Sequence, residues 1–150
     1  SSDIRCWAVV PAAGVGSRMG GETPKQYLLL AGRPVLEHSL QRLLDHPAIE
    51  RVLVAISAHD SRWRRCVLSS HPRVRQITGG KERCHSVLNA LRSLQQDAAP
   101  EDWVLIHDAA RPCLRRADLD RLLEELSGDP VGGVLAVPLI MGMQGYDDRI

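Results

Sequence analysis

Short apolar runs alternate with amphipathic segments along most of this chain. Continuous apolar or alternating stretches predict five strands, at 6–11, 51–57, 74–78, 103–106 and 133–139. Apolar residues spaced three and four apart predict helices over 35–46, 82–96 and 118–126, and a weaker, more charged helix over 60–70. Strands that alternate with helices are typical of a parallel sheet covered on both faces. We therefore predict an α/β fold, doubly wound around a mostly parallel sheet.

The pattern changes after residue 138. The last segment, LIMGMQGYDDRI, follows neither the strand nor the helix period over a useful length. We expect an α/β domain over 1–138 and an atypical tail over 139–150. The fold is expected to be truncated after about its fifth strand, as though a longer chain had been cut.

Size and composition limit the possible classes of protein. A chain of 150 residues with 44% hydrophobic and 25% charged residues fits one compact globular domain. Its apolar runs are shorter than the roughly 20 residues of a membrane-spanning helix, and residues 1–5 do not resemble a secretory signal. A net charge of +1 and few aromatic residues give little to attract nucleic acid or a membrane surface. We expect neither as a partner.

The scarcity of lysine and the spacing of the cysteines bear on the candidate sites and on the location of the protein. Of the 19 Lys and Arg residues only Lys25 and Lys81 are lysines, so a lysine in a candidate site is notable. The four cysteines are scattered and form no C-x-x-C pair. This spacing indicates free thiols in a reducing, cytoplasmic location, and it does not suggest a zinc site.

Ligands of such sheets bind beyond the carboxyl ends of the strands, and the first strand is followed there by a glycine-rich loop. The loop reads PAAGVGSRMGGETPKQ over 11–26, with cations at Arg18 and Lys25. It lacks the G-K-[ST] of a P-loop, and Met19 stands where the dinucleotide fingerprint needs a small residue. Backbone N–H groups and two cations favour a phosphate cradle. The alternative is a plain glycine-rich turn with two solvated cations.

A second candidate segment, GGKERCHS over 79–86, joins the third predicted strand to a helix. Gly80 allows close approach of a ligand, Ser86 offers a hydroxyl, and the helix N-terminus favours an anion or a polar base edge. Alternatively, the segment is only a turn and cap in which Glu82 complements the helix dipole.

A third candidate segment, HDAARP over 107–112, follows the fourth predicted strand. Asp108 suits Mg²⁺, which takes one or two carboxylates together with phosphate oxygens and water. The alternative is a turn-forming aspartate paired with Arg111. We interpret His107 as structural, and the H-E-x-x-H and G-x-S-x-G motifs are absent.

Taken together, the stretches PAAGVGSRMG, PKQYL, GGKERCHSVLNAL and VLIHDAARP resemble the 2-C-methyl-D-erythritol 4-phosphate cytidylyltransferase family of the non-mevalonate isoprenoid pathway. The resemblance extends over about residues 7–138. It implies a fold of the nucleotide-diphospho-sugar transferase type, with 1–138 as a partial nucleotide-binding domain. It also implies transfer of CMP from CTP to 2-C-methyl-D-erythritol 4-phosphate, with release of pyrophosphate and with Mg²⁺ as cofactor.

The resemblance assigns roles to individual positions. Arg18 and Lys25 correspond to the catalytic cations, and Asp108 to the carboxylate on the metal side. The loop 12–19 would wrap the triphosphate, and Ala109 would lie near the ribose. The nucleotide-binding positions as a set are Ala12, Ala13, Gly14, Gly16, Gly80, Arg83, Ser86, Asp108 and Ala109, of which Ala12, Ala13, Gly80 and Ser86 match the cytosine pocket.

Two departures from the family pattern matter. Lys81 stands where many members have aspartate, which reverses a charge beside the base pocket. After residue 138 the family continues with an arm used for homodimer formation and with groups that bind the acceptor, and neither is recognisable here. The chain is therefore expected to be inactive if it is truly truncated.

Other functions remain open at this stage. One is a cytidylyltransferase for another polyol phosphate, such as ribitol 5-phosphate; another is a non-catalytic nucleotide-binding remnant. A dehydrogenase is disfavoured by Met19 and by the sequence 57–59, Ser-Ala-His, where an acidic ribose partner would follow the second strand.

Overall fold

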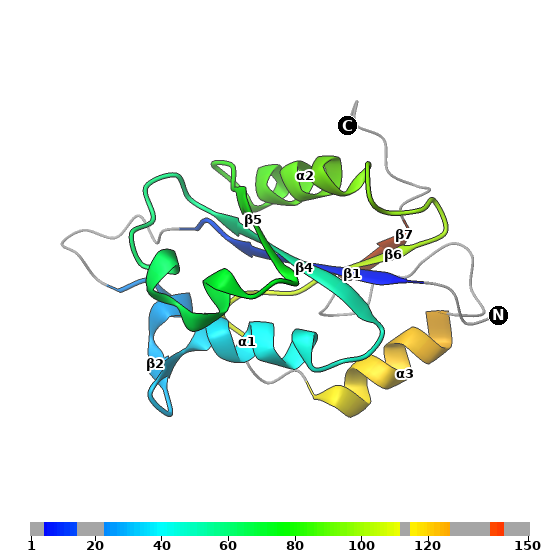
Figure 1. Cartoon of the computed structure of the whole chain (residues 1–150), viewed down its shortest axis with the longest axis horizontal. Helices are drawn as coiled ribbons and strands as arrows, with labels where there is room; N and C mark the ends of the chain where they lie inside the picture. Colours follow the sequence, from blue (N-terminus) through cyan, green and yellow to red (C-terminus); the bar gives the residue numbers. More distant parts are fainter. Residues whose placement is uncertain (1–4, 15–22, 112–114, 127–138, 143–150) are drawn as a thin grey trace.

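A five-stranded sheet forms the centre of the molecule (Figure 1). The computed structural model describes residues 5–14, 23–111, 115–126 and 139–142. The strands lie in the order β5-β4-β1-β6-β7, where β1 is parallel to both of its neighbours and β7 is antiparallel to β6. Their bounds are β1 (Cys6–Ala12), β4 (Ile49–Ile56), β5 (Val74–Thr78), β6 (Trp103–Ile106) and β7 (Leu139–Gly142). The predicted mostly parallel α/β fold is confirmed.

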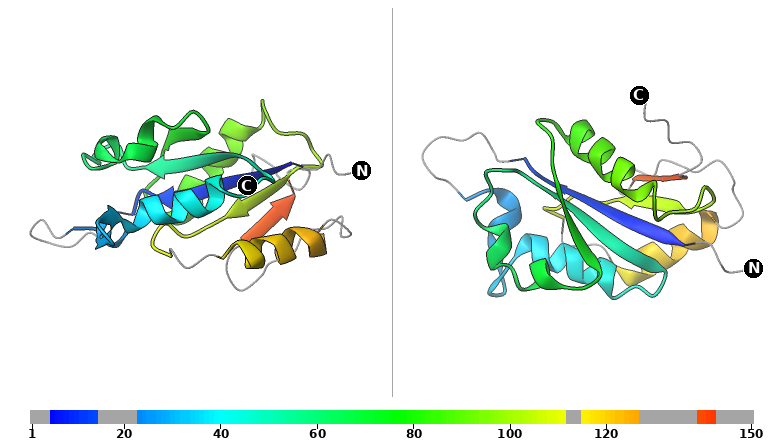
Figure 2. Two further views of the ribbon diagram at one scale, coloured as in Figure 1. Left: turned by 60° about the horizontal axis from the view of Figure 1, so that its bottom comes forward. Right: turned by 45° about the horizontal axis from the view of Figure 1, so that its top comes forward.

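Helices cover both faces of this sheet (Figures 1 and 2). Helices α1 (Val35–Leu44) and α3 (Arg116–Leu126) lie on one face, and α2 (Arg83–Leu94) lies on the other. Alternate residues of β1 serve the two layers: Ala8 and Val10 pack with α1 and α3, whereas Trp7 and Val9 pack with α2. The period of two along the strand and the leucine stripes along the helices therefore produce the doubly wound arrangement.

The segment 60–70, predicted as a helix, instead forms two short 3-10 helices, η3 (Trp63–Arg65) and η4 (Val67–Ser70). The Asp60 carboxylate accepts the backbone N–H groups of Arg62 and Trp63, at 2.7 and 2.9 Å, and so starts a tight turn. Cys66 then has extended backbone angles, which separates the two turns. The prediction of one continuous helix was wrong because local side-chain bonds compete with the α-helical ladder.

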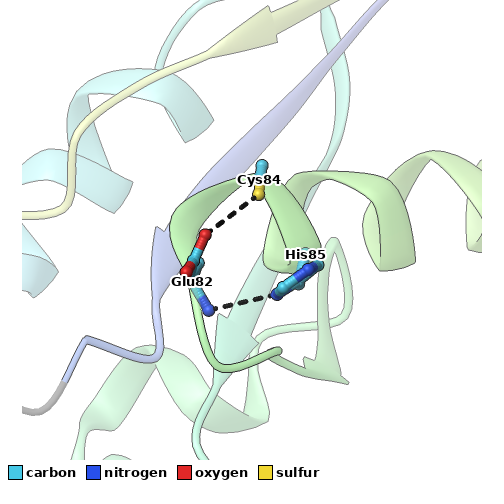
Figure 3. Close-up of side chains that lie close together, drawn as sticks. All are labelled: Glu82, Cys84 and His85. Atoms are coloured by element: carbon cyan, nitrogen blue, oxygen red, sulfur yellow. Dashed lines mark hydrogen bonds between the residues drawn. The ribbon is translucent and has the colours of Figure 1, made fainter. Parts of the chain in front are cut away.

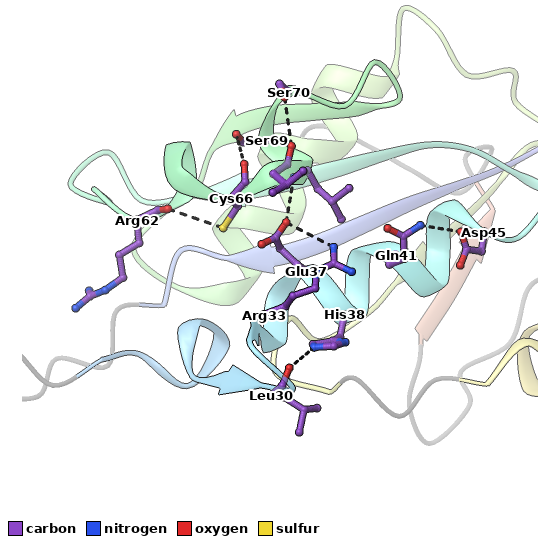
Figure 4. A network of polar contacts seen from close by, with 12 residues as sticks. Leu30, Arg33, Glu37, His38, Gln41, Asp45, Arg62, Cys66, Ser69 and Ser70 are labelled. Carbon is purple, nitrogen blue, oxygen red and sulfur yellow. Dashed lines mark hydrogen bonds and ion pairs between the residues drawn. The ribbon is translucent and has the colours of Figure 1, made fainter.

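A buried carboxylate fastens η4 to α1 (Figure 4). Glu37 is only 3% exposed, and its Oε1 accepts the Leu68 backbone N–H at 3.1 Å. The Arg33 guanidinium lies 3.7 Å from the same oxygen and balances its charge. Arg33 belongs to a small hairpin that the sequence analysis did not predict, β2 (Leu29–Leu30) with β3 (Arg33–Pro34). Its turn takes positive φ at Ala31 and Gly32, which is the geometry of a tight hairpin.

The expected tail contains a strand. β7 pairs along the whole of β6, from Trp103 opposite Gly142 to Ile106 opposite Leu139. The absence of a strand after residue 138 was therefore a wrong prediction, because the open edge of β6 supplies hydrogen-bond partners that the local pattern does not reveal. Residues 133–138 of the predicted fifth strand lie outside the described residues, and the domain boundary at 138 stays a prediction. No described helix is long and apolar enough to cross a bilayer.

His107 anchors the turn that follows β6. Its ring is 3% exposed, and its Nε2 lies 2.7 Å from the Arg111 carbonyl oxygen, to which it donates a proton. Its Nδ1 is buried and has no hydrogen-bond partner among the described residues. Burial lowers the pKa of His107, and this outweighs the bond to Arg111 that acts in the other direction. A neutral, buried imidazole that closes a turn is consistent with the structural interpretation of this residue.

The lowered pKa predicts a pH dependence of stability. Below pH of about 6.5 the unfolded chain binds a proton at this position that the folded chain resists, so the free energy of unfolding should fall as the pH falls. One such proton contributes a slope of at most about 1.4 kcal/mol per pH unit. Urea unfolding between about pH 7.5 and pH 5 should show a shallower slope for His107→Gln than for the parent chain. His59→Ala, which changes an exposed histidine, should keep the parent slope. Equal slopes for parent and His107→Gln would refute the assignment.

Candidate active site

The carboxyl ends of four parallel strands, β1, β4, β5 and β6, meet at one edge of the sheet. Ala12 of β1 lies opposite Ile56 of β4, which in turn lies opposite Thr78 of β5. On the other side of β1, Val9 pairs with Ile106, the last residue of β6. The three candidate segments, which follow β1, β5 and β6, are therefore brought to the same edge.

Two glycines allow this edge to close tightly. A Cβ atom at Gly79 would lie 2.2 Å from the Cβ of Ala13 and 2.9 Å from the Oγ of Ser86. At Gly80, a Cβ atom would lie 2.1 Å from the Cβ of His85. No real side chain fits at either position, so backbone from β5 lies directly against the end of β1 and the first turn of α2. Sequence reasoning singled out Gly80 and missed Gly79, although the glycine doublet itself was the available signal.

Ser86 fastens the first turn of α2 to the glycine pair. The side chain is 2% exposed, and its Oγ accepts the Gly80 N–H at 3.1 Å. One turn later, Asn89 donates to the carbonyl oxygen of Thr78 at 3.0 Å. The Ser86 oxygen is thus engaged within the protein, and the hydroxyl retains a proton that it can donate.

Asp108 lies between two arginines at the end of β6. Its Oδ1 accepts the Ala110 N–H at 2.9 Å, which forms the turn considered as an alternative above. Its Oδ2 lies 3.6 Å from Nε of Arg111 and 3.9 Å from Nη1 of Arg83. The Arg83 contact links α2 to β6 across the edge. Beside them, the carbonyl oxygen of Ala109 accepts the Ser39 hydroxyl of α1 at 3.2 Å.

The surroundings of Asp108 are compatible with a magnesium ion. Both arginine contacts at Oδ2 exceed hydrogen-bonding distance, and the Asp108 side chain is 34% exposed. Mg²⁺ keeps several waters and needs only one or two carboxylates when phosphate oxygens complete its shell. The partly exposed Asp108 carboxylate is therefore a ligand of the type that this ion takes.

A buried glutamine places Lys25 beside the end of β1. Gln26 is 7% exposed, and its Nε2 donates to the carbonyl oxygens of Ala12 and Gly14, at 3.2 and 3.3 Å. The next residue, Tyr27, is also buried and donates its hydroxyl proton to Asp60. Lys25 itself is exposed, at the start of the short 3-10 helix η2 (Lys25–Tyr27). Sequence reasoning missed Gln26 because nothing in K-Q-Y shows that its amide reaches the preceding loop.

Part of the predicted site lies outside the described residues, namely Gly16, Arg18 and Met19 of the glycine-rich loop. The remaining predicted positions gather at the described edge of the sheet: Ala12, Ala13, Gly14, Lys25, Gly80, Arg83, Ser86, Asp108 and Ala109. Their roles toward a ligand stay predictions. Lys81, the departure from the family pattern, is exposed.

The sequence and the fold match characterised proteins. The family model for 2-C-methyl-D-erythritol 4-phosphate cytidylyltransferase matches residues 6–149. A relative of that name from Pseudomonas putida (strain W619) is 59% identical over 133 residues, which is 88% of this chain and 57% of the relative. The chain therefore spans less than two thirds of the length of this relative.

Solved structures give the same result for the fold. A crystal structure of 4-diphosphocytidyl-2C-methyl-D-erythritol synthase matches with a TM-score of 0.75 and 36% identity, over 90% of this chain and 60% of that one. A CMP:2-keto-3-deoxy-manno-octonic acid synthetase, solved in complex with CTP, shares the fold with a TM-score of 0.61 and 20% identity. That match covers 85% of this chain and 49% of the other. The predicted nucleotide-diphospho-sugar transferase type of fold is confirmed. The chain belongs to the 2-C-methyl-D-erythritol 4-phosphate cytidylyltransferase family.

Proposed function

We propose that the protein containing this chain transfers CMP from CTP to 2-C-methyl-D-erythritol 4-phosphate and releases pyrophosphate, a step of isoprenoid biosynthesis. The observation that carries the proposal is the convergence at one sheet edge of three features: the close-packed glycine pair, the Asp108 carboxylate and the Lys25 segment fastened by Gln26. A site at the carboxyl edge of a parallel sheet is where such folds bind nucleotides.

The glycine pair and Ser86 support binding of the base. Where the backbone carries no side chain, its N–H and C=O groups can reach the polar edge of the cytosine ring. In a buried pocket, a polar group of the base that finds no hydrogen-bond partner lowers the binding affinity. Ala12, Ala13, Gly80 and Ser86 would provide this pocket, with the Ser86 hydroxyl proton as one donor. Lys81 is exposed, and no base contact is assigned to it.

The cations support the chemical step. An oxygen of the acceptor phosphate attacks the α-phosphorus of CTP in line, a new P–O bond forms, and the bond to the bridging oxygen breaks as pyrophosphate leaves. Negative charge grows on the α-phosphate and on the bridging oxygen, and Lys25 and Arg18 would neutralise it. Arg83, held loosely at 3.9 Å from Asp108, is free to turn toward the triphosphate. No covalent intermediate with the protein is needed.

Mg²⁺ is the cofactor we propose, held through Asp108. When bound there, the ion would offset the negative charge of the phosphate groups. We further propose a homodimer formed through the family's arm and a cytoplasmic location. The location is supported by the free thiols of Cys6, Cys66 and Cys84, which are those the structure describes.

Calorimetry with nucleotides tests the base pocket directly. This chain should bind CTP in the presence of Mg²⁺ more tightly than UTP or ATP, by about tenfold or more, which corresponds to about 1.4 kcal/mol. The reason is that a wrong base leaves polar groups of the pocket unpaired. Equal affinities for the three nucleotides would exclude a cytosine-specific site.

Lys25→Ala should lower kcat by about two to three orders of magnitude in the enzyme assayed with its acceptor-binding region, and should weaken CTP binding much less. The lysine is expected to act mainly on charge that develops in the transition state. Steady-state kinetics and calorimetry separate the two effects. Arg64→Ala, which removes an exposed cation of η3, serves as the control and should leave both quantities unchanged. Unchanged turnover in Lys25→Ala would disprove the role.

Gln26→Met keeps the length of the side chain but removes its two hydrogen bonds to the loop, at Ala12 and Gly14. Because Lys25 is its neighbour, turnover should fall by about ten- to a hundredfold, the cost of a displacement of about 1 Å. The matched control is Gln41→Met, which removes a bond to Asp45 on the exposed side of α1 and should retain the parent kcat. If both variants behave alike, Gln26 does not position the lysine.

A further inference from the structure

Three side chains of types that can ligate a metal, each of different chemistry, lie around the first turn of α2 (Figure 3). They are Glu82, Cys84 and His85, and one ligand atom of each lies within 4.8 Å of the others. The Sγ of Cys84 lies 3.7 Å from the Oε2 of Glu82, and the Nδ1 of His85 accepts the Glu82 backbone N–H at 3.4 Å. None of the three has a role in the function proposed above.

The spacing is close to that of a zinc site. Zinc lies about 2.3 Å from a thiolate sulfur and about 2.0–2.2 Å from nitrogen or oxygen, so two ligand atoms of a tetrahedral site are about 3.5 Å apart. The sulfur-to-carboxylate distance of 3.7 Å already matches this value. All three side chains are exposed, so the remaining approach needs rotation of surface side chains and release of the capping bonds of Glu82 and His85, with no repacking of the core.

Capping of the helix explains only part of this cluster. The Glu82 side chain accepts the His85 backbone N–H and the His85 ring accepts the Glu82 N–H, which together form a capping box at the start of the helix. The thiol of Cys84 has no place in such a cap. It is nevertheless turned toward the Glu82 carboxylate (Figure 3).

The local charges allow a dication of the soft or borderline kind. A thiolate and a carboxylate together balance the charge of Zn²⁺, and the imidazole is a neutral ligand. The positive end of the helix and the neighbouring Lys81 and Arg83 oppose a cation, but the helix end also favours the two anionic ligands. The Arg83 guanidinium lies 3.9 Å from the Asp108 carboxylate, so its positive charge is directed toward Asp108 and away from the cluster.

We propose that Glu82, Cys84 and His85 form a site for a thiophilic divalent cation of the zinc class, with water as the fourth ligand. The site lies on the rim of the candidate active site and is distinct from the magnesium position expected at Asp108, which offers oxygen alone. A bound ion would cross-link the turn that presents Arg83 and Ser86. The argument rests on the geometry of the cluster and does not depend on the proposed transfer reaction.

Cobalt provides the test, because Co²⁺ replaces Zn²⁺ in such sites and a thiolate ligand gives a charge-transfer band in the near ultraviolet. The chain, kept reduced with a phosphine, is titrated with Co²⁺ and then with Zn²⁺ as competitor. We expect a thiolate band at one equivalent that Zn²⁺ abolishes and that a large excess of Mg²⁺ leaves unchanged.

Variants identify the ligands. Cys84→Ser should lose the band, and His85→Ala and Glu82→Gln should each weaken Zn²⁺ binding by about tenfold or more, since even indirect partners of a metal typically contribute that much. His59→Ala, at an exposed histidine on another loop, should bind as the parent does. Far-ultraviolet circular dichroism confirms that each variant is folded. A band that persists in Cys84→Ser, Zn²⁺ binding unaffected by His85→Ala, or displacement of Co²⁺ by Mg²⁺ would each overturn the proposal.

Discussion

The site depends on the absence of side chains at Gly79 and Gly80. Because even a methyl group at Gly79 would overlap Ala13, the end of β1, the end of β5 and the first turn of α2 can come together only around bare backbone. Ser86 then closes the contact with a hydrogen bond to Gly80. This contact fixes the start of α2, from which the Arg83 side chain extends to within 3.9 Å of Asp108.

The second constraint is a pair of hydrogen bonds that the Gln26 side chain donates at the carboxyl end of β1. Gln26 satisfies two carbonyl groups of a segment that leaves the sheet, where the strand ladder no longer supplies partners. A buried amide that bridges two backbone oxygens resists displacement, since moving it would leave all of these groups unpaired. The backbone that holds Lys25 is therefore fixed by the hydrogen bonds of Gln26, although the Lys25 side chain is exposed.

Much of this architecture follows from the local sequence pattern, and the exceptions have identifiable physical causes. Strand β6 matches its predicted range because the apolar run WVLI is bounded by polar residues, and β5 ends where predicted because Gly79 and Gly80 follow it. The leucine stripes of α1 and α2 have no other place to be buried. Strand β7 and the Gln26 bridge were missed because each depends on a partner far along the chain: β7 pairs with β6, and Gln26 donates to Ala12. The 3-10 turns after β4 were missed because the local bonds of the Asp60 carboxylate to Arg62 and Trp63 compete with the α-helical ladder.

The arrangement around Asp108 also bears on how the protein meets anions. Arg83 and Arg111 both face one carboxylate oxygen, so much of their field is compensated inside the molecule. An anion that binds Arg83 or Arg111 replaces Asp108 as the ionic partner of that guanidinium group. The positive charge that it meets is therefore already partly balanced. Its affinity should thus vary less with ionic strength than the two guanidinium charges alone would suggest, because dissolved salt screens both partnerships alike.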